Sequence, residues 1–178
     1  MDAPAWYEIV DKDAPLFQGD ILFSIPLILT NDDPTKETIN VEVEEYQGII
    51  VSQTCDLTCK DIDVILFCPI ISLDEFVAKK TKPENKKEII KIKNDIRAGR
   101  YVAYYLLNKI NQTGLPADYF VVDLKNPRSI PFEHIGRIKE RTPVRPRLNT
   151  PYREHLSQAF ARVFMRVGLP DSIPEFTA

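Results

Sequence analysis

The nine residues VSQTCDLTC, at positions 51–59, bring two thiols, two threonine hydroxyls, a glutamine and a carboxylate into one short stretch. Cys55 and Asp56 are adjacent, and Cys59 follows three residues later. A thiolate acts as a nucleophile when a base, usually histidine, lies beside it. Thiols at this spacing can also be ligands of zinc. Because an apolar run precedes the stretch, its side chains are expected at the end of a buried strand.

Four interpretations of this stretch stay open. A Cys–His hydrolase needs His134 or His155 beside Cys55, and no hydrolase signature surrounds Cys55. A zinc site of Cys55, Cys59 and His134 lacks the second ligand pair that zinc sites usually have. The stretch can also be only a turn, or it can be a rim that binds a ligand. The ligand-binding candidates on such a rim are Gln53, Thr54, Cys55 and Asp56.

A basic segment, GRIKERTPVRPRLNTPYR at 136–153, is a second candidate for binding and is interpreted as a loop stiffened by prolines. The planar guanidinium of arginine matches the oxygens of a phosphate, and Tyr152 offers a ring on which a base can stack. The competing interpretation is a solvated linker that pairs with the acidic N-terminal half. The binding candidates in this segment are Arg145, Arg147 and Arg153.

Charge is divided unevenly along the chain. Residues 1–75 hold three Lys and sixteen Asp/Glu, a net charge of −13, whereas residues 76–178 hold twenty Lys/Arg and ten Asp/Glu, a net charge of +10. This division predicts either a basic face for nucleic acid or a pairing of surfaces, within one chain or head-to-tail between copies. The alternative is that each half only solvates its own surface.

Length and composition predict one globular domain over residues 1–178, since the chain has 178 residues and a hydrophobic content of 44%. Its apolar runs are too short to span a bilayer, and its N-terminus lacks the pattern of a signal peptide. We therefore expect a cytoplasmic protein with reduced thiols and no membrane partner. Cys68 lies in an apolar run and is expected to be buried and inert, and no metal or cofactor is expected.

Short apolar runs separated by turn residues predict several strands. The runs GIIVSQ (48–53) and VILFCPI (64–70) are apolar on both faces, which predicts adjacent central strands. Ser72 and Glu75 have the spacing of a capping box, so a helix is expected to begin there. The remaining strands are expected at 17–29, 39–46, 100–108, 117–124 and 129–138.

Two helical segments complete the predicted fold. The first is a helical insertion at 74–99, whose second helix ends at Gly99. The other is a C-terminal helix at 150–168, with Thr150 as its N-cap, an apolar stripe on one face, and Gly168 at its end. The expected class is α+β: a small, strongly bent antiparallel sheet or barrel with a helical insertion and a C-terminal helix.

Four segments resemble the MazF/PemK toxin family, small SH3-like barrels that cleave RNA without a metal. The segments are QGDILF (18–23), GIIVSQTCD (48–56), VILFCPIIS (64–72) and DYFVVDLKNPRSIPFEHI (118–135). The resemblance implies an SH3-like barrel closed by a C-terminal helix. The family's catalytic Arg and Thr positions correspond here to residues 44–47 and to Ile71 or Ser72, so the catalytic residues are not carried over.

The sequence therefore predicts a MazF/PemK-like barrel that lacks the family's ribonuclease mechanism and binds nucleic acid or a phosphate-bearing ligand. RNA, DNA, a second copy or another protein are the expected partners. One alternative is a nuclease with a rebuilt site, in which Asp20 and Asp56 hold a metal or Arg147 and Arg153 stabilise the transition state. The other is a protein-interaction subunit of a larger assembly.

Overall fold

Strand β4 (Val64–Ser72) organises the fold because it pairs with three other strands. Its neighbours are β3 (Glu42–Ile50), β6 (Phe120–Asp123) and β7 (Arg128–Pro131). Strand β2 (Ile21–Leu29) pairs with β3 and β5 (Tyr104–Leu107) pairs with β6, which completes a six-stranded antiparallel sheet. The computed structural model describes residues 4–30, 32–33, 35 and 37–165.

The predicted pairing of the two central strands is confirmed. Ile49 lies opposite Cys68, and Ile50 lies opposite Phe67. The two strands expected at 39–46 and 48–53, however, are one continuous strand, β3. Gly48 does not interrupt the strand. It is buried beside the Phe67 ring, where a larger side chain has no room.

A second sheet has two strands, β1 (Tyr7–Asp11) and β8 (Val144–Leu148), which are antiparallel. Strand β1 was not predicted from the sequence. The interpretation of 136–153 as a loop was wrong, because this segment contains most of helix α4 (Ile135–Arg141), all of β8 and the start of the last helix. The short turn η1 (Phe132–His134) precedes α4, so the strand expected at 129–138 is confined to β7.

The helical insertion forms two helices, α2 (Leu73–Ala78) and α3 (Lys86–Arg97). The Ser72 hydroxyl accepts a hydrogen bond from the Glu75 amide at 3.1 Å, as the capping box predicts. Helix α3 is capped by the side chain of Asn85, and Gly99 follows it with a φ of 70°. That left-handed conformation is the one expected for the residue after a helix.

The C-terminal helix α5 (Tyr152–Phe164) packs its apolar stripe on the core through Leu156, which is fully buried. Thr150 does not cap this helix: Pro151 occupies the cap position, and the Thr150 hydroxyl bonds to the Glu154 carboxylate instead. Phe164, the last residue of the helix, is 52% exposed although its spacing continues the stripe. The predicted end at Gly168 lies outside the described residues.

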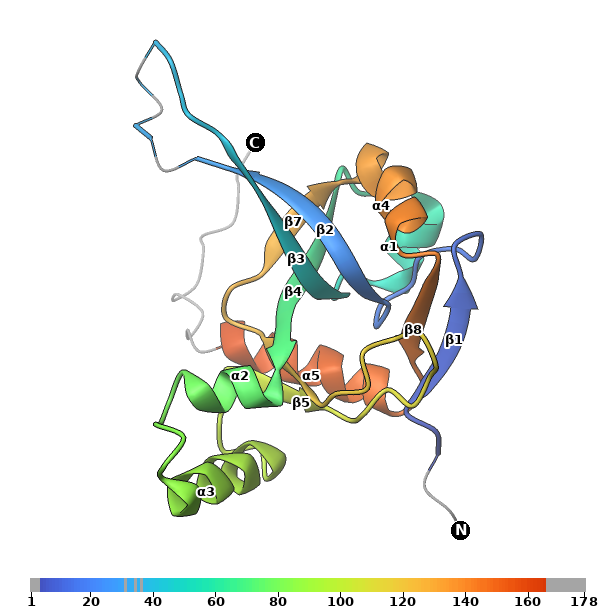
Figure 1. Cartoon of the computed structure of the whole chain (residues 1–178). Coiled ribbons are helices and arrows are strands. Elements are labelled where there is room, and N and C mark those ends of the chain that lie inside the picture. The colour runs from blue at the N-terminus through green and yellow to red at the C-terminus, as the bar shows by residue number, and fades with distance from the viewer. Residues whose placement is uncertain (1–3, 31, 34, 36, 166–178) are drawn as a thin grey trace, which may run out of the picture.

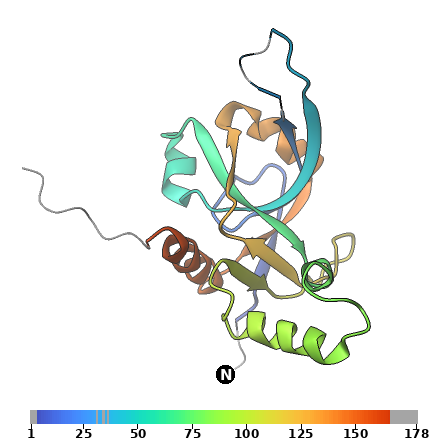
Figure 2. The same ribbon diagram turned by 90° about the vertical axis from the view of Figure 1, so that its left-hand side faces the viewer.

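Three helices cover three separate apolar clusters. Helix α5 covers one apolar cluster, α4 covers a second through Ile138, and α3 covers a third through Ile92 and Ile96. The fold is therefore α+β with an antiparallel sheet, and the strands of the described part form no closed barrel. The β2–β3 hairpin projects from the body at the end away from α3 (Figures 1 and 2). Within the described ranges no helix has the length and apolar character to cross a membrane.

Candidate functional site

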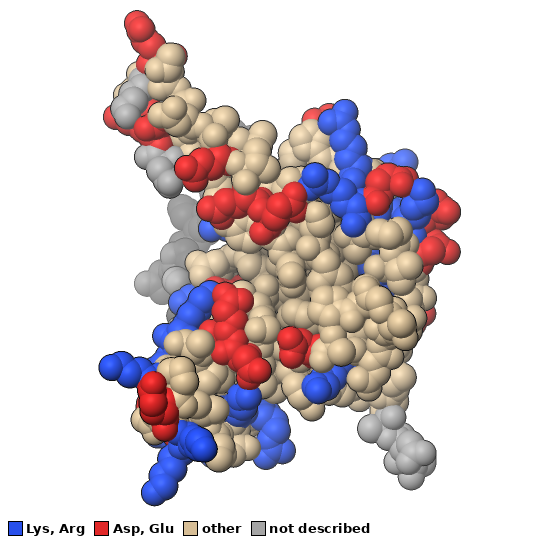
Figure 3. Space-filling view, viewed as in Figure 1, with Lys and Arg blue, Asp and Glu red and all other residues tan. Residues whose placement is uncertain are grey.

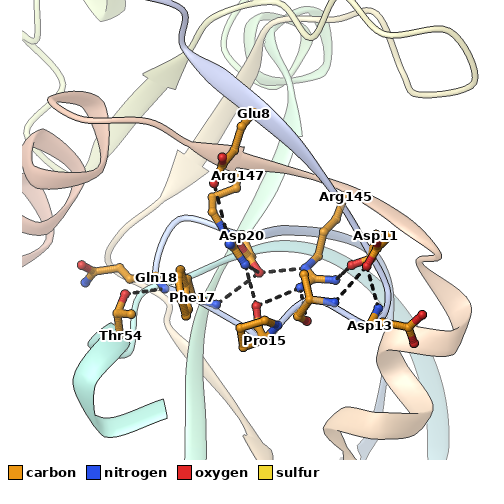
Figure 4. A network of polar contacts seen from close by, with 11 residues as sticks. Glu8, Asp11, Asp13, Pro15, Phe17, Gln18, Asp20, Thr54, Arg145 and Arg147 are labelled. Atoms are coloured by element: carbon orange, nitrogen blue, oxygen red, sulfur yellow. Dashed lines mark hydrogen bonds and ion pairs between the residues drawn. The ribbon is translucent and has the colours of Figure 1, made fainter. Parts of the chain in front are cut away.

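Two predicted ligand-binding arginines, Arg145 and Arg147, form a buried network around Asp20 (Figure 4). They lie two residues apart on β8, and both Nε atoms donate to the Asp20 carboxylate, at 2.7 Å from Arg145 and 2.5 Å from Arg147. The Arg147 Nη2 atom adds a third bond to Asp20 at 3.0 Å. The remaining hydrogen bonds of the two guanidinium groups go to the backbone carbonyls of Asp11, Ala14 and Pro15.

This network holds the residue 11–20 segment against β8 and the start of β2. Asp20 and Arg145 have no exposed side-chain surface, and the Arg147 side chain is 7% exposed. Arg147 also lies over the Phe17 ring, with its guanidinium carbon 4.2 Å from the ring centre, and faces Glu8 at 3.7 Å. Buried charges are retained in proteins when they are paired and hydrogen-bonded. The two arginines are therefore structural, and they do not present free cations to a ligand.

The other cations of the predicted basic loop are also partly engaged. Arg141 bonds to Glu45, and Arg153 bonds to Glu154 at 3.0 Å. Burial and the nearby Arg145 guanidinium lower the pKa of Lys139. Arg137 is exposed on α4 and forms no ion pair with the described residues. The segment is thus a poor phosphate-binding surface, contrary to its interpretation as a free basic loop.

The stretch 51–59 ends not in a loop but in helix α1 (Thr54–Cys59). Gln53 is exposed at the N-cap of this helix. The Thr54 hydroxyl accepts a hydrogen bond from the backbone N–H of Gln18 at 3.2 Å. The rim and the arginine network are therefore neighbours through residues 17–20 (Figure 4). Cys55 is exposed, and its thiol contacts Asp56 at 3.3 Å. The rim's role in ligand binding stays a prediction.

No histidine among the described residues is placed as a base for a Cys55 nucleophile. Within the described part of the chain, neither histidine contacts this thiol: His134 lies 3.5 Å from Glu133, and the His155 ring packs on Tyr152. Asp20 and Asp56 do not form a metal site together either, since Asp20 is enclosed by the two arginines. Among the residues the structure describes, no group of three or more His, Cys, Asp or Glu is arranged to hold a metal ion.

The three thiols differ in accessibility, which gives a first testable prediction. Cys68 is fully buried, and burial with the nearby Asp123 charge raises its pKa to about 12. Cys55 and Cys59 are exposed. A thiol reagent should therefore label two cysteines in the native protein, and the third only after denaturation. Fast labelling of Cys68 in the native protein would contradict this arrangement.

A groove of about 610 Å³ lies where the family resemblance places its catalytic positions. Glu45 and Gln47 from β3 line it together with Ile71 and Ser72 from β4. Its charged groups are mostly engaged: Ser24 and Arg141 bond to Glu45 and lower its pKa, and Lys79 pairs with Glu75 at 2.8 Å. The two sets of positions that correspond to the family's catalytic Arg and Thr therefore do line one groove. In this chain, however, they supply the Glu45 carboxylate and no arginine or threonine.

A second cationic surface is formed by the segment 79–100, which we call the helical lobe. It holds nine Lys/Arg and three Asp/Glu, a net charge of +6, and Figure 3 shows its basic side chains gathered at one end of the molecule. Lys79, Lys93 and Arg100 pair with acidic residues. Besides Lys80, which lies against aromatic rings, the exposed cations for which the structure shows no ion pair to a described residue are Lys82, Lys86, Lys87, Lys91 and Arg97.

Aromatic side chains lie directly beside this lobe. The Lys80 ammonium is surrounded by Phe76, Tyr101 and Tyr104, with ring centres 4.8, 4.9 and 5.5 Å away. A cleft of about 400 Å³ opens at the end of α3, between β5 and α5. It is lined by Tyr101, Val102, Tyr104, Tyr105, His155, Gln158 and Arg162, among others. Rings beside unpaired cations can stack bases while the cations bind phosphates.

The fold and this surface together define an α+β domain with a cationic helical lobe and an aromatic cleft. No protein-family model, curated protein or solved structure matches the chain. Sequence reasoning did predict a basic face, but it assigned that face to residues 137–153 because of their arginine density. The lobe could have been recognised from the segment KKEIIKIK (86–93), in which lysines are interspersed with isoleucines.

Proposed function

We propose that this protein binds single-stranded nucleic acid through the helical lobe, with bases stacking in the neighbouring aromatic cleft. The observation that carries the proposal is the set of five exposed cations on the lobe that form no ion pair with a described residue, together with the cleft at the end of α3 that is lined by three tyrosines. The backbone phosphates contribute most of the affinity in such complexes. Single strands are favoured over duplexes because only unpaired bases can enter a cleft and stack.

The proposal keeps the resemblance of the four sequence segments to MazF/PemK proteins but not the mechanism of that family. The groove at β3 and β4 supports this view, because Glu45 and Gln47 occupy the region of the family's arginine. A carboxylate there repels an RNA backbone, whereas the lobe attracts it. The binding surface is thus moved from the groove to the helical insertion, and the function is binding rather than cleavage.

Salt-dependent binding tests this proposal. Lys87 and Lys91 lie four residues apart on α3, both exposed. In anisotropy titrations with a labelled oligonucleotide, Lys87→Ala/Lys91→Ala should reduce the slope of log affinity against log salt by roughly 1.4, since each lost contact to a single strand contributes about 0.7. Wild-type affinity should fall steeply between about 50 and 200 mM salt.

A matched control removes the same charge elsewhere. Lys109 follows β5 and Arg137 lies on α4, and both are exposed. Lys109→Ala/Arg137→Ala should leave the slope unchanged. The proposal fails if the wild-type protein binds neither RNA nor DNA at low salt, or if both double variants change the slope equally.

A further inference from the structure

A second cavity, which we call the Trp6 cavity, lies beside the aromatic cleft and has a volume of about 460 Å³. Trp6, Tyr119, Leu106 and Leu107 supply most of its apolar lining. Arg97 of α3 also lines it, exposed and without an ion pair to a described residue. Two aromatic rings and an unpaired cation are the groups that bind a base and its phosphate in single-stranded nucleic acid.

The Trp6 indole is held in place by its neighbours. The Tyr152 ring stacks on it, with 3.9 Å between the ring centres and 12° between the planes. The Tyr152 hydroxyl donates to the Pro4 carbonyl at 3.1 Å, and the Tyr7 hydroxyl donates to the Asn108 carbonyl at 2.7 Å. A half-buried ring fixed in this way loses little conformational freedom when a ligand stacks on it.

The Trp6 cavity and the aromatic cleft adjoin along β5. Tyr104 and Tyr105 line the cleft, and the next two residues of the strand, Leu106 and Leu107, line the cavity. Figure 1 shows β5 between α3 and α5. A ligand that follows the strand therefore passes from one hollow into the other.

The other borders of the two hollows are also continuous. At the end of α3, Arg97 lines the cavity and Gly99 lines the cleft. At the start of α5, the Tyr152 ring contacts both Trp6 of the cavity and His155 of the cleft. The two hollows thus form one path, with α3 on one side and α5 on the other.

The outer edge of β5 is open along this path. Strand β5 is the last strand of its sheet and pairs only with β6 among the described strands. The Ala103 carbonyl accepts a hydrogen bond from the Leu124 amide on the β6 side at 3.0 Å. Because backbone groups alternate in direction along an antiparallel strand, the N–H and C=O of Leu106 point outward. Neither forms a hydrogen bond with a described residue, so both are available to a ligand.

We propose that the Trp6 cavity is a second base-binding pocket, so that a single strand lies along the open edge of β5 with one base in the aromatic cleft and another against Trp6. This inference rests on the proposed nucleic-acid binding and extends it from one stacking position to two. Arg97 lies two residues before Gly99, which borders the cleft, and is placed to bind a phosphate between the two bases.

Tryptophan fluorescence tests the second pocket in the unmodified protein, because Trp6 is the only tryptophan of the chain. On titration with an oligothymidylate, a base that stacks on the indole should change the Trp6 emission and protect it from quenching by acrylamide. Inorganic polyphosphate is a polyanion without bases. It should bind the helical lobe and leave the Trp6 emission and its quenching unchanged.

Replacing Tyr119 with Ala removes the second ring of the cavity at a position that is 39% exposed. In the anisotropy titrations Tyr119→Ala should lower affinity about 5- to 150-fold, the loss expected for one stacked base. The salt slope should stay the same, because no charge is removed. Tyr46→Ala is the matched control and should leave affinity unchanged, since Tyr46 lies on β3 and lines neither hollow. Lys109 lies over the Tyr119 ring but does not line the cavity, so its removal remains a control for charge.

Three results would overturn the second pocket and leave nucleic-acid binding intact. The first is oligothymidylate binding, detected by anisotropy, that leaves the emission and quenching of Trp6 unchanged. The second is an equal change of Trp6 emission with polyphosphate, which would show a response to charge alone. The third is wild-type affinity in Tyr119→Ala, with a circular dichroism spectrum that shows a folded protein. If the wild-type protein binds no oligonucleotide at low salt, the proposed function fails and the second pocket fails with it.

Discussion

Replacing Asp20 with Asn is expected to lower the free energy of unfolding by about 3–5 kcal/mol, because it leaves two buried arginines without their shared carboxylate. Asp20 accepts three hydrogen bonds from Arg145 and Arg147. The asparagine is similar in size but carries no charge and has only one oxygen acceptor. Glu8, at 3.7 Å from Arg147, is half exposed and compensates little.

Urea denaturation measures this loss, which should appear as a lower midpoint at an unchanged slope. Asp61→Asn is the matched control, since Asp61 is exposed and should change stability by less than about 0.5 kcal/mol. Asp20→Asn combined with Arg145→Met should cost less than the sum of the single changes, because the partners interact directly. A loss below about 1 kcal/mol for Asp20→Asn would contradict the role given to the network.

Replacing Gly48 with Ala is expected to lower stability by about 1–3 kcal/mol through overpacking. An added Cβ would lie 2.3 Å from Cδ2 and 2.9 Å from Cε2 of the Phe67 ring. Phe67 is fully buried and contacts Tyr46 edge-on, so its ring cannot move aside without disturbing the cluster under α4. Gly48 is also paired with Pro69 of β4, which limits how far the backbone at Gly48 can shift to relieve the contact.

Two further variants separate overpacking from a general effect of losing glycine. In a Phe67→Leu background the same Gly48→Ala change should cost less, because the smaller side chain leaves space for the methyl group. Gly136→Ala in helix α4 should instead stabilise the protein by about 0.4–1 kcal/mol, since nothing lies within 4 Å of its added Cβ. Equal costs at Gly48 with and without the Phe67 ring would refute the close contact.

Local patterns in the sequence were sufficient for several elements of the fold. The apolar runs around Ile49 and Cys68 predicted paired central strands, and both belong to the sheet as adjacent strands. The Ser72 cap and the left-handed Gly99 were also predicted, because each depends on residues within one turn of the helix end. The apolar stripe of α5 predicted its burial through Leu156 for the same reason.

The candidate site could not be predicted to the same extent. Six cations at 137–153 indicated a basic loop, but the pattern contains no information about partners distant in sequence. Asp20 is more than one hundred residues from Arg145 and Arg147, and only the pairing of β8 near the start of β2 brings the three together. Conversely, the lysines of α3 were not among the predicted binding residues, since nothing in the sequence shows that Tyr101 and Tyr104 lie beside Lys80.

The sequence by itself determined the antiparallel α+β class, the central strand pair and the positions of α2, α3 and α5, because hydrophobic periodicity and capping act over a few residues. Only the tertiary structure decided which charges are available for binding. It buried Arg145 and Arg147 around Asp20, and it left Lys82, Lys86, Lys87, Lys91 and Arg97 exposed without described ion-pair partners. The physical reason is that a side chain's charge is a property of its type, whereas its availability depends on burial and on partners supplied by other elements.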